Sequence, residues 1–181
     1  ETKMVAMNRT SRIRKLPTKL LVVDWGILNA SVSIYHGSRG RYSCLDSFQV
    51  EWLAESNNSP ILLGQLLADE LQRRHITVRD SLVSIPRRQV VLKNLTLPLS
   101  DRSELIDAVH LQCENLFPVE RSSLAIDFLD HPAEKDLSHS GMASGSQVLV
   151  AAVPCDLLNT INKSLCNAGL RTIAIGIAEL G

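Results

Sequence analysis

The 181-residue sequence predicts a mixed α/β protein made of two modules. Short runs of β-branched and aliphatic residues alternate with segments in which apolar residues recur at helical spacing. The first three extended runs follow one another with short links, which predicts an antiparallel meander. A helical segment then separates the third run from a fourth, and such a crossover lets the fourth strand lie parallel to the first.

The first module is expected over residues 19–87. Extended runs at 19–25, 31–35 and 42–52 precede a helix that begins at Ser59-Pro60, where a capping side chain is followed by proline. Gly64 inside this helix indicates close packing against a neighbour, because glycine otherwise weakens a helix by up to about 1 kcal/mol. The strand at 81–85 completes the strand, strand, strand, helix, strand order of an RNase-H-like half.

A second module is expected to follow, beginning at about residue 89. A strand at 89–97, a helix at about 101–116 and a strand at 124–129 precede a Gly- and Ser-rich stretch at 131–146, which predicts a flexible loop. A strand at 147–153 then leads into a helix that starts at Pro154 and ends at Gly169. The final strand is expected at 171–177.

Composition limits the classes of partner. Nineteen basic and nineteen acidic side chains cancel, so we expect no general attraction to nucleic acid or to an anionic membrane, and any such contact would be local. The apolar runs are too short to cross a bilayer and no signal peptide opens the chain, which predicts a cytoplasmic protein. Residues 1–18 form a basic, flexible tail, interpreted first as solvated and alternatively as a peripheral contact with anionic lipid.

Cysteine and histidine spacing predicts no metal site. The cysteines lack any C-x-x-C pair and lie in apolar, periodic segments, so we expect buried, reduced thiols at Cys44, Cys113, Cys155 and Cys166. The five histidines lack the spacing of ligands on a helix.

Four local patterns carry a family resemblance: Leu21–Gly26; Leu82–Pro86 followed by Val90–Pro98; Leu105–Pro118 with Ile126–Phe128; and Val148–Pro154 continuing to Ala168–Leu170 and Ile173–Ile177. In this order they resemble the PilM family of type IV pilus assembly proteins, which is related to FtsA and to the cytoplasmic domain of GspL within the actin-like ATPase superfamily. The resemblance implies an RNase-H-like (actin-like ATPase) fold. Subdomain 1A would occupy residues 19–87 and 169–181, with an inserted α+β subdomain 1C at 88–168, and the second lobe would be absent.

The resemblance also implies where a nucleotide would bind. Asp24 and Gly26 match the family's acid and glycine near metal and phosphates, and Asn29 and Ser31 are the other candidates for cofactor contact. Positions 27, 28 and 30 are aliphatic where the family has serines, and no lysine follows. We therefore assign no catalytic residue and no metal ligand, and expect ATP and Mg²⁺ only in combination with a second lobe.

In the PilM family the cleft between 1A and 1C receives the cytoplasmic tail of PilN, a single-span membrane protein. Pro86, Arg87 and Arg88 lie where such a groove would begin, although the arginines could equally occupy a solvated turn. The leading hypothesis is a non-catalytic scaffold of a type IV pilus or type II secretion-like machine, at the inner face of the inner membrane. The alternative is an ATP-binding actin-like ATPase represented by its N-terminal half, and self-association stays open.

Overall fold

The computed structural model describes residues 17–38, 41–52, 59–97, 102–117, 121–131 and 146–178. Nearly all of the predicted basic tail at 1–18 and of the predicted loop at 131–146 lies outside these residues. The chain divides into two compact units. The larger unit includes the described chain up to Gln89 and from Asp156 onward, and the smaller unit includes Val90–Cys155.

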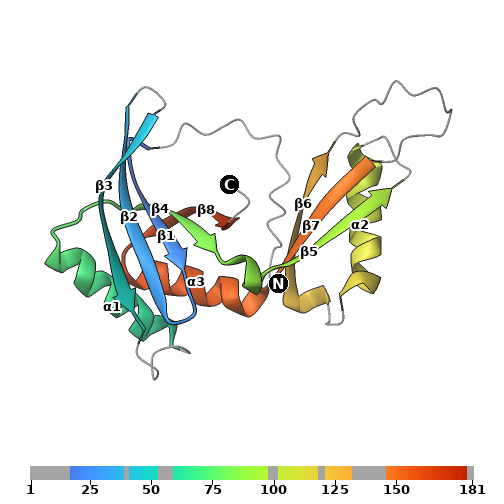
Figure 1. The fold of residues 1–181 in the computed structure, drawn as a ribbon. Helices are drawn as coiled ribbons and strands as arrows, with labels where there is room; N and C mark the ends of the chain where they lie inside the picture. Colours follow the sequence, from blue (N-terminus) through green and yellow to red (C-terminus); the bar gives the residue numbers. More distant parts are fainter. Residues whose placement is uncertain are drawn as a thin grey trace. The chain divides into compact units, whose positions relative to one another are not determined.

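The larger unit is built around a five-stranded sheet with the strand order β3-β2-β1-β4-β8. β1 pairs antiparallel with β2, and β2 with β3, which confirms the predicted meander. β4 lies parallel to both β1 and β8, so three strands run in one direction (Figure 1). The strands are β1 (Lys19–Trp25), β2 (Asn29–Ser38), β3 (Arg41–Glu51), β4 (Asp80–Ile85) and β8 (Arg171–Ile177).

The crossover from β3 to β4 is made by α1 (Pro60–Arg73), which begins where the sequence predicts. The Ser59 hydroxyl accepts a hydrogen bond from the Leu62 amide at 3.4 Å and so caps the helix. Pro60 lies in the first turn, where a missing N–H leaves no partner unsatisfied. The chain leaves the helix through His75, whose φ of 57° breaks the helical path.

Gly64 brings α1 into contact with α3 (Cys155–Asn167). A Cβ atom on Gly64 would lie 2.5 Å from Asn167 Cβ and 2.6 Å from the Ser164 carbonyl oxygen. The side-chain amide of Asn167 also donates to the Pro60 carbonyl at 3.4 Å. The predicted close packing at Gly64 is therefore confirmed.

The core of the larger unit lies on one face of its sheet. Leu21 and Val23, on alternate positions of β1, are fully buried, and the helices contribute Leu67 and Leu165. Residues of the neighbouring strands that share this face are also buried, namely Ala30, Val32, Ile34, Phe48, Val50, Val83 and Ile85. We refer to this as the packed face and to the opposite one as the open face.

The smaller unit is a three-stranded antiparallel sheet with one helix. Its strands β5 (Val91–Leu97), β7 (Ser146–Pro154) and β6 (Leu124–His131) pair in that order, and α2 (Arg102–Leu116) follows β5 in the chain. The core consists of buried residues from α2, from the residue that follows it and from the sheet, namely Leu97, Leu105, Val109, Cys113, Phe117, Leu124, Val148, Val150 and Ala152.

Two predictions differ from the structure. The chain returns to the larger unit at Asp156, so α3 belongs there rather than to an insertion that ends at 168. β7 runs directly into α3, so no linker marks the boundary between the units. Among the cysteines, Cys113 is buried as predicted and Cys155 is partly buried, whereas Cys44 and Cys166 are exposed.

Candidate functional site

A row of polar or small residues crosses the open face of the five-stranded sheet. Asp24 pairs in register with Ser31 on one side and with Ser84 on the other. Gln49 extends the row beyond Ser31, and Gly176 extends it beyond Ser84. Residues paired in register project from the same face, with neighbouring strands about 4.8 Å apart. The Asp24 carboxylate is exposed and stands between two half-buried hydroxyl groups.

The turn between β1 and β2 brings all four predicted cofactor residues into one hairpin. Asp24 and Ser31 are cross-strand partners, and the Gly26 amide donates to the Asn29 carbonyl at 2.9 Å. A Cβ atom on Gly26 would approach that carbonyl oxygen to 2.6 Å, so the tight turn requires glycine. The same hydrogen bond engages the Gly26 amide within the hairpin, so this amide does not point outward as a free anion donor.

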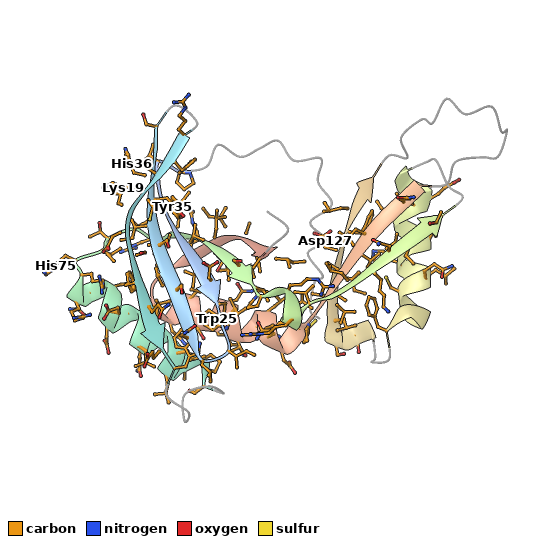
Figure 2. The ribbon with its side chains drawn as sticks, viewed as in Figure 1. Lys19, Trp25, Tyr35, His36, His75 and Asp127 are labelled. Atoms are coloured by element: carbon orange, nitrogen blue, oxygen red, sulfur yellow. The ribbon has the colours of Figure 1, made fainter. Side chains whose placement is uncertain are left out.

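The tip of this hairpin is apolar. Ile27 is 49% exposed and Leu28 is 67% exposed. Beneath the tip, the rings of Trp25 and Trp52 are both buried, with centroids 5.1 Å apart and planes tilted by 43° (Figure 2 labels Trp25). The two tryptophans therefore act as core residues. Aliphatic side chains at the tip offer an anion neither a charge nor a hydrogen bond.

Among the residues that the structure describes, no group of three or more His, Cys, Asp or Glu side chains could hold a metal ion. Over the same residues, no helix is both long and apolar enough to cross a bilayer. The open-face row supplies one carboxylate with hydroxyl neighbours, which can accept and donate hydrogen bonds.

The predicted partner-binding residues lie at one of the two chain connections between the units. Arg87–Gln89 forms a 3-10 turn, closed by a hydrogen bond of 2.9 Å from the Gln89 amide to the Pro86 carbonyl. Pro86 and Arg87 are half-buried, and Arg88 is exposed. Arg88 can therefore offer its guanidinium to a ligand.

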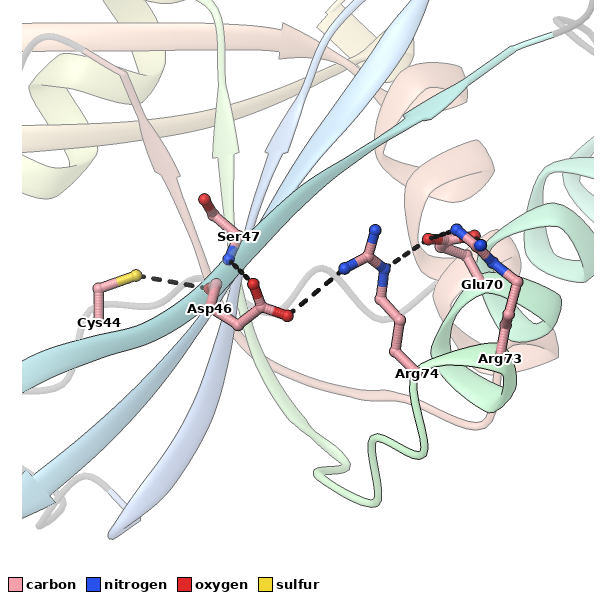
Figure 3. A network of polar contacts seen from close by, with 6 residues as sticks. All are labelled: Cys44, Asp46, Ser47, Glu70, Arg73 and Arg74. Atoms are coloured by element: carbon pink, nitrogen blue, oxygen red, sulfur yellow. Dashed lines mark hydrogen bonds and ion pairs between the residues drawn. The ribbon is translucent and has the colours of Figure 1, made fainter.

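A network of ion pairs lies elsewhere on the larger unit, at the C-terminal end of α1 (Figure 3). Arg73 donates to Glu70 through Nη2 at 2.7 Å and Nε at 2.9 Å, and Arg74 bridges Glu70 to Asp46 of β3. The hydrogen bonds from Arg73 and then Arg74 lower the pKa of Glu70 from 4.5 to about 2. The guanidinium carbon of Arg74 also lies 4.5 Å from the centre of the Phe48 ring. The network joins helix to sheet, so this shifted pKa has a structural cause.

The sequence alone did not identify Ser84 and Gln49 as neighbours of Asp24. Their positions follow from the register of β1 with β4 and of β2 with β3. The available signal was the alternation of residues along β4, which places Ser84 on the face of the sheet opposite to the buried Val83. Gly176 of β8 lies in the same row, because it pairs with Ser84.

Comparison with known proteins gives matches at the level of fold. No family model and no curated protein matches the chain. Among solved structures, the PilM–PilN type IV pilus biogenesis complex matches with a TM-score of 0.70 and 19% identity over 89% of this chain. The cytoplasmic domain of EpsL, an inner membrane component of the type II secretion system of Vibrio cholerae, matches with a TM-score of 0.59 and 12% identity over 88%.

These matches confirm the predicted α/β fold and the predicted resemblance in fold to PilM and to the cytoplasmic domain of a type II secretion component. The chain spans 48% of the matched chain in the PilM–PilN complex and 57% of the EpsL chain.

Proposed function

We propose that this chain is an assembly scaffold of a type IV pilus or type II secretion-like machine, acting at the cytoplasmic face of the inner membrane. The observation that carries the proposal is the fold match over 89% of the chain to a protein of the PilM–PilN complex. The EpsL match adds support, since it is the cytoplasmic domain of an inner membrane component.

The partner we propose is the short cytoplasmic segment of a PilN-like membrane protein. Arg88 is exposed beside the half-buried Pro86 and Arg87, at a chain connection between the two units. A guanidinium donates to carbonyl and carboxylate oxygens with fixed geometry, so this segment suits an extended or acidic peptide. The β1–β2 turn supports binding rather than catalysis, because its tip carries exposed Ile27 and Leu28.

The test is fluorescence anisotropy with a labelled peptide from the cytoplasmic segment of the PilN-like protein of the same organism. Arg88→Glu should weaken binding about tenfold or more, since a charge-assisted hydrogen bond contributes about 1.5–3 kcal/mol. Lys163→Glu makes the same change of charge at an exposed residue of α3. This variant serves as the control and should bind the peptide like the parent. Failure of the parent chain to bind at micromolar peptide would contradict the proposal.

Nucleotide binding is the second candidate function, and the open-face row favours it. Asp24 lies between Ser31 and Ser84, where a carboxylate could hold a hydrated Mg²⁺ bound to a nucleotide. Isothermal titration of the full-length protein with MgATP, compared with Asp24→Ala, tests this function. Micromolar binding that disappears in Asp24→Ala would establish it, whereas equal heats for both proteins would remove it.

A further inference from the structure

Although the net charge of the chain is zero, several cations lie together at one end of the five-stranded sheet. Because β1, β4 and β8 are parallel, their first residues lie at the same end. Lys19 begins β1, Arg79 immediately precedes β4 and Arg171 begins β8. Lys19 pairs with His36 near the end of β2, and Ser38, the last residue of β2, pairs with Arg41. Arg41, the first residue of β3, therefore lies at the same end of the sheet. We call these four cations the basic edge.

The basic edge is open to solvent. Lys19, Arg41 and Arg79 are exposed, and the side chain of Arg171 is 76% exposed. Lys19, Arg79 and Arg171 border one shallow depression together with Asp80. Asp80 accepts from Arg171 Nε at 2.7 Å and so offsets one charge, which leaves a surplus of positive charge. Figure 2 shows Lys19 beside His36, at the end of the sheet where β1 begins.

The basic N-terminal segment joins the protein at this same edge. The Gly37 amide donates to the Thr18 carbonyl at 2.7 Å, and the Tyr42 hydroxyl donates to the Pro17 carbonyl at 3.1 Å. A Cβ atom on Gly37 would lie 2.4 Å from the Tyr42 ring, so glycine permits this contact. The sequence of residues 1–16 contains five basic residues and one acidic residue. Pro17, the first residue that the structure describes, therefore contacts the protein at the basic edge.

We propose that the basic edge binds the anionic headgroups of a lipid bilayer. Exposed cations spread over the ends of several strands suit a planar array of negative charges better than one compact ligand. Tyr42, 37% exposed in the hairpin that holds Pro17, adds an amphipathic ring of the kind found at membrane–water interfaces. This inference rests on the proposed function only for placing the chain near a membrane.

The experiment is cosedimentation of the 181-residue chain with sucrose-loaded vesicles of 70% phosphatidylcholine and 30% phosphatidylglycerol. Binding should exceed that to pure phosphatidylcholine and should fall as NaCl rises from 50 to 300 mM. Arg41→Gln combined with Arg79→Gln should weaken binding about twenty-five-fold, because each cation near such a surface strengthens binding about fivefold. The control combines Lys93→Gln with Lys163→Gln, two exposed lysines outside the basic edge, and should bind like the parent.

Three results would overturn the proposal: equal binding to both vesicle types, equal losses in the edge and control variants, or loss on deleting residues 1–16 with no loss in the edge variant. Tighter binding to single-stranded RNA than to the anionic vesicles would assign the edge to nucleic acid instead. The PilN-like peptide should bind the variant with Arg41→Gln and Arg79→Gln as it binds the parent, so a failure of vesicle binding would leave the proposed function standing. Failure of the parent to bind the peptide, with vesicle binding intact, would reject only the proposed function.

Discussion

At the end of β1, the two faces of the five-stranded sheet carry different kinds of side chain. On β1, Leu21 and Val23 are fully buried in the packed face, while Asp24 is exposed on the open face between Ser31 and Ser84. Alternation along a strand makes this separation possible, because successive residues project to opposite sides. One strand can therefore specify the fold with one set of residues and offer polar groups to a ligand with the other.

This difference explains why the fold was easier to predict than its chemistry. Burial of an apolar side chain stabilises the fold wherever it occurs on the packed face. A functional row requires particular groups to meet across strands, which depends on long-range register. The fold matches to PilM and EpsL at 19% and 12% identity fit this view, since packed faces tolerate sequence change when their pattern is kept.

The largest loss of stability is expected from Leu67→Ala, on the helix α1 that contributes to the core of the packed face. Leu67 is fully buried on α1, so the substitution leaves a cavity and should lower the free energy of unfolding by about 2–5 kcal/mol. Ile61→Ala on the same helix is the control, because Ile61 is 61% exposed and its loss should cost less than about 1 kcal/mol. Urea unfolding followed by circular dichroism measures both. Equal losses would mean that α1 does not cover the packed face.

A smaller loss is expected from Gly64→Ala. The new methyl would lie 2.5 Å from Asn167 Cβ and 2.6 Å from the Ser164 carbonyl oxygen, so α1 and α3 must separate, at a cost of about 1–3 kcal/mol. The better helix propensity of alanine offsets up to about 1 kcal/mol of this cost. Gly176→Ala is the matched control, because a Cβ there meets no atom within 4 Å. Urea midpoints should fall for Gly64→Ala alone; an increase would show that the helices can adjust.

Particular residues show how far the sequence could predict the molecule. Ser59 and Pro60 mark the start of α1 by local chemistry, and the structure confirms it. The return of the chain to the larger unit at Asp156 was placed too late, because β7 joins α3 without a loop. Ser84 was missed because its pairing with Asp24 depends on the register between strands separated by α1. Cys44 was expected to be buried, but it lies on an edge strand beside an irregularity in register and is exposed.

The ion-pair network around Glu70 should make the stability of the fold depend on pH. The pKa of Glu70 is about 2 in the folded chain and 4.5 ordinarily, so the unfolded chain binds more protons between these values. Its stabilisation is complete above pH 4.5 and is lost as the pH falls through 2. Glu70→Gln should therefore flatten the fall in urea midpoint between pH 5 and pH 2. Asp69→Asn, an exposed carboxyl next to it, is the control, and an unchanged slope in Glu70→Gln would contradict the assignment.

The smallest stability effect is expected on the open face, from Asp24→Ala. Asp24 is exposed and does not contribute to the packed face, so the free energy of unfolding should stay within about 0.5 kcal/mol of the parent. Its cross-strand partners Ser31 and Ser84 are hydroxyl residues that can turn to water when the carboxylate is removed. If Asp24→Ala lowered the free energy of unfolding by more than about 2 kcal/mol, the Asp24 side chain would stabilise the fold itself. An unchanged free energy of unfolding would mean that the fold does not require the carboxylate, which is then available to bind a ligand.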